Sequence, residues 1–261
     1  MNRLILILLL PLCLLSTALA AETAEEKGLA IAEEMDRRDT GWGDQTARME
    51  MILRNRRGDE SRRQIRVRTL EVENDGDKSL TIFDHPRDVK GTAFLSYTHA
   101  LKPDEQWLYL PALKRVKRIA SRNKSGPFMG SEFAYEDMTS QEVPKYSYRF
   151  LREEEVGGRK TLVIERYPQY EYSGYTRQVV WIDSGMYRPV KVEFYDRKDS
   201  LLKTLTLSGY HRYLDRYWRP DEMHMINHQT GKQTTLRWSD YRFRTGLTSR
   251  DFDKNSLKRA H

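Results

Sequence analysis

Residues 107–138 read WLYLPALKRVKRIASRNKSGPFMGSEFAYEDM, and this stretch joins three different kinds of sequence. It begins as an aromatic strand, continues as a cationic run without an acidic residue, and ends as a segment rich in glycine and aromatic side chains. A strand that only fills a core has no need of such a segment, whereas a binding surface does. Such a surface suits several kinds of ligand. The cellular compartment of the protein therefore has to be inferred before the ligand can be.

The first twenty residues have the pattern of a secretory signal. Arg3 precedes an apolar run from Leu4 to Leu15, and the segment closes with Ala18-Leu19-Ala20, the small-x-small pattern that a signal peptidase cleaves. The apolar run is shorter than the roughly 18 residues that a transmembrane helix needs. We therefore predict a cleaved signal peptide over residues 1–20 and export of the remaining chain to the periplasm.

The composition bounds what the exported chain can be. Its only cysteine, Cys13, lies within the signal, so the exported part can form neither a disulfide nor a thiolate and needs a core that holds the fold unaided. The full chain carries a formal net charge of +7, which suits nucleic acid, anionic lipid or an acidic protein partner. Export argues against nucleic acid. No linker or repeat divides residues 21–261, so we expect a single domain and a monomer.

The pattern along the chain predicts one helix followed by strands. Thr23 and Glu26 form a capping box, and the apolar stripe behind them ends before the Gly41-Gly43 breaker. From there the period changes to two, as in Ala47, Met49, Met51 and Leu53. Turn residues recur at spacings of about ten residues, which is the rhythm of an antiparallel meander or barrel.

The order of these segments resembles the outer-membrane lipoprotein-sorting (LolA-like) family, in its transporter-associated branch. The motifs that carry the resemblance are FMGSEFAYEDM at 128–138 and VVWIDSGMYRPVKVEFYDRKDSLLKTLTL at 179–207, and it extends from near Glu25 to near Leu257. It implies a mainly β fold, an incomplete antiparallel β-barrel of about eleven strands with short helices covering an apolar cavity. It also implies a periplasmic carrier that binds lipid acyl chains or lipoprotein and transfers them toward the outer membrane, together with an inner-membrane transporter.

The cavity and its lid have candidate residues of two kinds. Each buried methylene of an acyl chain contributes about 0.8 kcal/mol, so an apolar pocket alone can hold the chain. Flexible methionine and broad aromatic side chains suit a pocket that must also release it. The alternative is that these residues are ordinary core. The candidates are Met49, Met51, Leu53, Phe94, Trp107, Tyr109, Phe128, Met129, Phe133 and Tyr135.

The cationic run allows two interpretations. It could meet lipid phosphates or an acidic patch on a membrane partner, in peripheral contact with the membrane. It could equally be a solvated strand edge whose charges deter aggregation. Its residues are Lys114, Arg115, Lys117, Arg118, Arg122 and Lys124.

No motif in the sequence indicates catalysis. The chain lacks G-x-S-x-G, a P-loop and H-E-x-x-H. His224 and His228 would lie about 13 Å apart on a strand, too far to share a metal ion. We expect no enzyme activity, no catalytic residue, no metal and no cofactor. The leading hypothesis is the carrier, and the alternative is a non-catalytic envelope adaptor that docks on a membrane transporter through its basic face.

Overall fold

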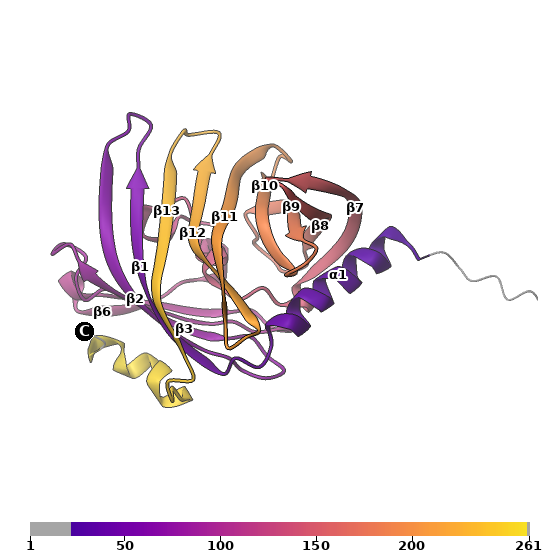
Figure 1. The fold of residues 1–261 in the computed structure, drawn as a ribbon. Coiled ribbons are helices and arrows are strands. Elements are labelled where there is room, and N and C mark those ends of the chain that lie inside the picture. Colours follow the sequence, from indigo (N-terminus) through magenta and orange to yellow (C-terminus); the bar gives the residue numbers. More distant parts are fainter. Residues whose placement is uncertain (1–21, 260–261) are drawn as a thin grey trace, which may run out of the picture.

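The protein is a single curved sheet with one α-helix at its edge (Figure 1). The computed structural model describes residues 22–259, so the predicted signal peptide lies outside the described residues. None of the helices within 22–259 is both long and apolar enough to cross a membrane. Helix α1 spans Ala24–Asp39. The strands are β1 (Asp44–Arg54), β2 (Glu60–Leu70), β3 (Lys78–His85), β4 (Ala93–Tyr97), β5 (Glu105–Leu110), β6 (Arg115–Arg118), β7 (Tyr146–Val156), β8 (Arg159–Pro168), β9 (Tyr175–Asp183), β10 (Arg188–Asp196), β11 (Leu201–Tyr213), β12 (Tyr217–Asn227) and β13 (Gln233–Phe243).

The sheet is open, which confirms the predicted incomplete antiparallel barrel. Its strands follow the order β6-β5-β4-β3-β2-β1-β13-β12-β11-β10-β9-β8-β7, and every neighbouring pair is antiparallel. The first and last strands are joined through the pairing of β1 with β13, while β6 and β7 form the two free edges. The sheet has thirteen strands, whereas the resemblance implied about eleven. The four-residue edge strand β6 lies in the cationic run, where the sequence shows no clear strand alternation.

Helix α1 begins and ends where the sequence predicts. The Thr23 hydroxyl oxygen accepts from the Glu26 backbone N–H at 3.1 Å, and the Thr23 N–H donates to the Glu26 carboxylate at 2.8 Å, which completes the capping box. The helix covers the free edge at β7. Gly28 lets the two backbones approach, since a Cβ there would lie 2.8 Å from the backbone of Arg149 and Phe150.

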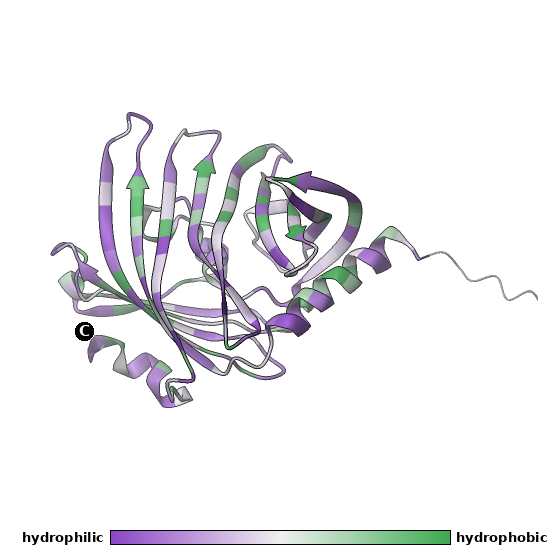
Figure 2. Cartoon of the chain, in the orientation of Figure 1, coloured by the Kyte–Doolittle hydropathy of each residue, from purple (hydrophilic) through white to green (hydrophobic). Residues whose placement is uncertain are grey.

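The two faces of the sheet bury three separate apolar clusters, the smallest of which is formed by Val163, Val179 and Trp181 on β8 and β9. Hydrophilic and hydrophobic bands alternate along the strands, as Figure 2 shows, because successive side chains point to opposite faces. The concave face carries the largest cluster, to which nearly every strand contributes. The outer face of β3, β4 and β5 carries a smaller one, covered by the C-terminal 3-10 helices η6 (Ser249–Phe252) and η7 (Lys254–Arg259).

The connection from β6 to β7 runs through the interior. We call residues 119–145 the plug. It contains four short 3-10 helices: η2 (Ser121–Asn123), η3 (Phe128–Gly130), η4 (Tyr135–Met138) and η5 (Val143–Lys145). Its aromatic side chains belong to the concave cluster, so the segment predicted to be a lid packs against the inner surface of the sheet.

Candidate ligand-binding site on the concave face

The plug fills the concave face with its own aromatic rings. Phe128 is fully buried, and its ring centroid lies 5.0 Å from that of Phe94, 6.1 Å from Phe83 and 5.5 Å from Tyr135. Phe133 is also buried in the same cluster. Aromatic pairs at such distances stabilise by about 0.5–1.5 kcal/mol beyond the burial of their area. The plug therefore occupies the apolar surface on which an acyl chain would have to lie.

Most of the predicted cavity residues lie together here. Met49 and Met51 are buried neighbours on β1, and Leu53, one step further along the same face, packs against them. Eight of the ten candidates belong to the concave cluster or pack against it: Met49, Met51, Leu53, Phe94, Phe128, Met129, Phe133 and Tyr135. The alternation read from the sequence thus identified one face correctly on β1.

Trp107 and Tyr109 lie on the opposite face of the sheet. In the pairing of β4 with β5, Phe94 faces Leu108 while Leu95 faces Trp107, so Leu108 and not Trp107 points into the concave side. Trp107 packs in the outer cluster beneath the C-terminal 3-10 helices. Residues 105–110 do form a strand, but Trp107 and Tyr109 point to its outer face, so their prediction as cavity residues was wrong.

Polar groups on the sheet hold the plug in place. The Lys203 ammonium on β11 donates to the Asp137 carboxylate at 2.7 Å and to the Glu132 carbonyl at 2.8 Å, and its side chain is 4% exposed. The Tyr175 hydroxyl donates to the same Asp137 carboxylate at 2.9 Å, and burial raises the pKa of Tyr175. Removal of only one partner from a buried ion pair of this kind strongly destabilises a protein, because it leaves the other charge buried and uncompensated.

Further anchors come from β2, β5 and the β12–β13 hairpin. Arg63 Nη1 donates to the Met129 carbonyl at 2.6 Å, and burial lowers the pKa of Arg63. Gln106 Nε2 donates to the Tyr135 carbonyl at 2.8 Å. The remaining two anchors bind Glu132: its N–H donates to Thr234 Oγ1 at 3.0 Å and its carboxylate accepts from Asn227 Nδ2 at 2.7 Å.

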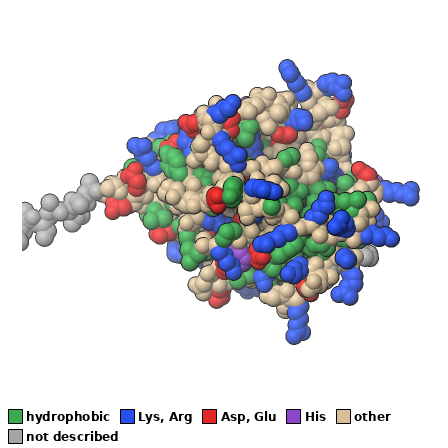
Figure 3. Space-filling model, turned by 180° about the vertical axis from the view of Figure 1, so that it is seen from behind, with side chains coloured by type: hydrophobic (Ala, Val, Ile, Leu, Met, Phe, Trp, Pro, Cys, Tyr) green, Lys and Arg blue, Asp and Glu red, His purple; other side chains and the backbone are tan. Residues whose placement is uncertain are grey.

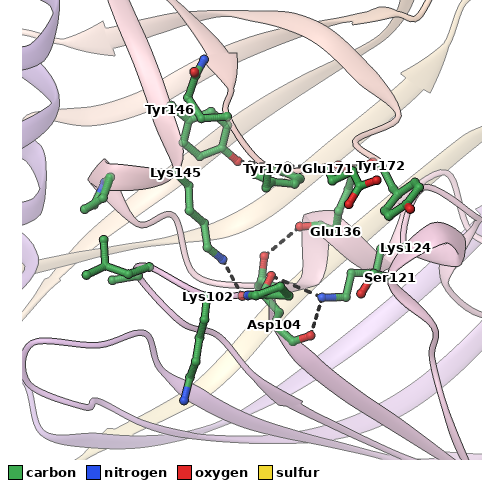
Figure 4. A pocket seen from close by; sticks show the side chains of 16 residues that line it. Lys102, Asp104, Ser121, Lys124, Glu136, Lys145, Tyr146, Tyr170, Glu171 and Tyr172 are labelled. Atoms are coloured by element: carbon green, nitrogen blue, oxygen red, sulfur yellow. Dashed lines mark hydrogen bonds and ion pairs between the residues drawn. The ribbon is translucent and has the colours of Figure 1, made fainter.

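A seam pocket of about 330 Å³ opens where the turn before β5, the plug and the segment around β7 and β8 come together. Figure 4 shows that Lys145 and Lys124 approach Asp104 from two sides. Lys145 Nζ lies 2.5 Å from Asp104 Oδ1, and Lys124 Nζ donates to the Asp104 carbonyl at 2.5 Å. Burial lowers the pKa of Lys124. Both ammonium groups are thus enclosed in the protein.

Glu136 closes the inner wall of the seam pocket. Its carboxylate accepts from the Tyr170 hydroxyl at 3.0 Å, from Ser173 Oγ at 2.9 Å and from the Gly174 N–H at 2.8 Å. Burial raises the pKa of Glu136, with the neighbouring Asp137 adding to the effect. Adjacent acids in a glycine-rich loop are usually solvated, so the sequence alone did not indicate that both would be buried.

A second cavity of about 210 Å³ lies between the plug and the inner face of β2, β3, β12 and β13. Met223 and Leu236 supply apolar wall, and Asp77 and Trp238 supply polar groups. Burial raises the pKa of Asp77 to about 8. The buried Trp238 Nε1 has no hydrogen-bond partner among the described residues. An incoming acceptor atom could therefore satisfy this N–H.

The cationic run is divided by the fold. Lys114, Arg115, Lys117 and Arg118 are exposed on and before the edge strand β6, and Arg122 is exposed in η2. Figure 3 shows Lys and Arg side chains projecting on the side of the molecule opposite α1, where β6 lies. Lys124 does not share this surface, because its ammonium turns inward to Asp104.

Lys203 and Arg63 are site residues that the sequence analysis missed. Lys203 lies on the same face of β11 as the buried Leu205. A lysine at a position where the alternation of the strand predicts an inward side chain could have indicated this site. Arg63 similarly lies on the same face of β2 as the buried Ile65 and Val67. Two arginines of β1, Arg48 and Arg54, instead form exposed ion pairs with Asp240 and Glu60.

The chain is an open antiparallel barrel with an internal plug over an apolar concave face, and known proteins share this fold. A family model described as an uncharacterized protein matches residues 75–259. A crystal structure from Vibrio parahaemolyticus, described as an outer membrane lipoprotein-sorting protein domain, is 62% identical, with a TM-score of 0.88, over 90% of this chain and 99% of that one. A DUF1329 family protein from Desulfovibrio piger is 30% identical, with a TM-score of 0.85, over 90% and 99% of the two chains.

A LolA superfamily protein from Nitrosomonas europaea shares the fold at 21% identity, with a TM-score of 0.70 over 87% of this chain and 98% of that one. No curated protein matches the chain. The chain belongs to the family of the outer membrane lipoprotein-sorting protein domain from Vibrio parahaemolyticus, as the resemblance in its sequence predicted, and it shares the fold of the LolA superfamily protein.

Proposed function

We propose that the protein is a periplasmic carrier that binds lipid acyl chains, including those of lipoproteins, on its concave face after the plug has moved aside. The observation that carries this proposal is the position of Phe128, a fully buried ring of an irregular segment that lies on the largest apolar surface of the sheet. The plug then occupies the place of the cargo when no cargo is bound. No chemical step is part of this function.

Energetics support an exchange between plug and cargo. An acyl chain of about a dozen methylenes gains on the order of 10 kcal/mol on leaving water, before ordering costs. Each hydrogen bond that holds the plug contributes only about 0.5–1.5 kcal/mol net, because water replaces it on release. The cavities of about 210 and 330 Å³ beside the plug lie below or at the lower end of the usual size range of ligand pockets, so the whole apolar concave face becomes available to a cargo only after the plug has moved aside.

The relatives support the cargo and the compartment. The protein from Vibrio parahaemolyticus is described as an outer membrane lipoprotein-sorting protein domain, which makes lipoprotein acyl chains the first cargo to test. The sequence of residues 1–20 supports export. All thirteen strands share one sheet, which supports a single domain over residues 21–261. That the carrier acts as a monomer is part of the proposal.

The exposed cationic residues on and before β6 supply a surface for the partner that loads or unloads the carrier. We place an inner-membrane transporter, or the membrane surface beside it, against Lys114, Arg115, Lys117 and Arg118. The same surface serves the alternative function, an adaptor whose interior carries no lipid. The exposed positions and the absence of acid within the run favour this surface over others.

Two measurements test the carrier. Native mass spectrometry of protein purified gently from the bacterial envelope should show bound lipid or acylated peptide, and a fluorescent fatty-acid probe should bind the delipidated protein. A matched pair of variants locates the site: Met51→Gln on the concave face should weaken probe binding, whereas Tyr109→Gln on the outer face should not. Protein that is empty and ignores the probe would overturn the carrier and favour the adaptor.

A further inference from the structure

A pocket of about 370 Å³ lies outside the concave face, where three parts of the chain meet. Its walls are the last turn of α1, the β9–β10 turn at Gly185 and Met186, and the β11–β12 turn. We call it the arginine pocket, because its lining includes Arg37, Arg38, Arg188, Arg212 and Arg216.

Carboxylates do not balance the charge of the arginine pocket. Asp215 is the acid in its lining, and Glu34 and Asp39 approach from α1. Each of these two helix acids is shared by two arginines. The pairs are Glu34 with Arg37 at 2.7 Å and Arg38 at 2.6 Å, and Asp39 with Arg188 at 2.8 Å and the adjacent Arg219 at 2.7 Å. A further acid of α1, Asp36, also interacts with Arg188. Counting Arg219, six arginines thus meet four carboxylates, which leaves a surplus of two positive charges.

Backbone carbonyls hold two of the guanidinium groups in place without neutralising them. Arg216 Nη2 donates to the Arg37 carbonyl at 2.9 Å, and Arg38 Nη1 donates to the Gly185 carbonyl at 2.9 Å. The Arg38 guanidinium also lies 4.0 Å over the Tyr187 ring. These contacts fix the donors before a ligand arrives, which reduces the ordering cost of binding.

Two donors of the pocket remain unused. Arg188 is 8% exposed, and its Nε is buried with no hydrogen-bond partner among the described residues. Arg212 is exposed and contacts the Trp218 ring, but it pairs with no acid in residues 22–259. A buried polar group without a partner is costly. Arg188 lines the pocket, so a small shift of its side chain would let a bound anion accept from this N–H.

We propose that the arginine pocket binds a phosphate group, either on a lipid headgroup or as the free ion. Guanidinium groups from three directions suit the several oxygens of a tetrahedral phosphate, and the forked donors of arginine match its geometry. The pocket has space for a small headgroup beyond the phosphate, and its largely polar lining does not suit an acyl chain. The C-terminal end of α1 opposes an anion by its dipole, an effect that the surplus of arginines outweighs.

Binding of phosphate to purified full-length mature protein tests this proposal. Isothermal titration with inorganic phosphate, against sodium chloride of equal ionic strength, measures the free ion. Flotation with phosphatidylglycerol vesicles, against phosphatidylcholine vesicles, measures a phosphate held on an anionic lipid. Arg212→Gln should weaken the observed binding about tenfold, because it removes one charge-assisted donor. Arg188→Lys keeps the charge beside Asp39 but removes Nε, and it should weaken binding as well.

Arg87→Gln is the matched control, since Arg87 is an exposed arginine on the turn after β3, outside the arginine pocket. It should leave binding unchanged. Binding of inorganic phosphate alone would identify the free ion as the ligand, and binding of anionic vesicles alone would identify a lipid headgroup. The proposal is overturned if the wild-type protein binds neither, or if Arg87→Gln weakens binding as much as Arg212→Gln. Uptake of the acyl probe should be the same in all these variants, which separates this site from the concave face.

Discussion

Two irregular segments cover the two faces of the same sheet, and they are held in different ways. The plug on the concave face is held by buried rings such as Phe128 and also by buried polar groups such as the pair of Lys203 with Asp137. The C-terminal segment on the outer face is held by Phe252 and Leu257, which are 0% and 1% exposed, with a hydrogen bond from the Tyr97 hydroxyl to the Phe252 carbonyl. Under the proposed function, water would replace the polar anchors of the plug and an acyl chain would replace its rings on the apolar face, whereas no such replacement is proposed for the apolar side chains of the C-terminal segment. The plug is therefore the cover that we expect to leave.

The largest effect is expected from a matched pair of phenylalanines, one on each cover. Phe252→Ala should lower the free energy of unfolding by about 3–5 kcal/mol, the usual cost of truncating a buried ring. Phe128→Ala should cost only about 2 kcal/mol, because the loss cannot exceed the free energy that holds the plug to the sheet. Urea denaturation measures both. Equal losses, with no gain in acyl-probe binding for Phe128→Ala, would contradict the difference between the covers.

Removal of the main anchor should loosen the plug selectively. Lys203→Met leaves the Asp137 carboxylate buried without its cation and should cost about 2 kcal/mol in unfolding free energy, the same limit that release of the plug sets for Phe128→Ala. It should also increase the affinity for a fluorescent fatty-acid probe, since less free energy is needed to displace the plug. The double variant Lys203→Met/Asp137→Leu removes both charges and should recover most of the stability. A single variant that binds the probe more weakly would mean that the plug helps to hold cargo.

The cavity under the plug should make stability depend on pH. Burial raises the pKa of Asp77 to about 8, so the folded protein keeps a proton that the unfolded chain releases from about pH 4 upward. Its contribution to stability is therefore complete at low pH and is lost as the pH rises toward 8. Asp77→Asn should match the wild type near pH 4 and be more stable by about 1–2 kcal/mol at pH 8. Melting temperatures recorded across this range check the sign, and parallel curves would show that Asp77 titrates normally.

The smallest effect on stability is expected at the cationic surface. Arg115→Glu/Arg118→Glu should change the unfolding free energy by less than about 0.5 kcal/mol, because both side chains are exposed. It should nevertheless abolish docking on inner-membrane vesicles that contain the transporter, while acyl-probe binding stays intact. Loss of probe binding without loss of docking would remove β6 as the partner surface.

Local patterns in the sequence predicted much of the fold. The capping box at Thr23 and Glu26 gave the start of α1, and the apolar phase of Met49 and Met51 gave the inner face of β1. These features depend on neighbours a few residues apart, so the sequence states them directly. The resemblance supplied the open barrel and the lid, which local patterns could not.

Features that depend on distant contacts were not predictable. The phase of β5 is decided by pairing with β4 and by the C-terminal segment, which together place Trp107 outside. The inward turn of Lys124 depends on Asp104, 20 residues earlier, and the burial of Asp137 depends on Lys203, 66 residues later. A charge run or an acidic pair in one sequence carries no information about such partners.

The close contact at Gly28 makes the two edges of the open sheet mechanically unequal. The backbones of α1 and β7 meet so closely at Gly28 that a Cβ there would clash with the backbone of Arg149 and Phe150, so the helix braces this edge. At the other edge, β6 is four residues long and packs against the short 3-10 helix η7. If the sheet widens for the cargo that we propose, the shorter strand β6 is the edge from which it would open.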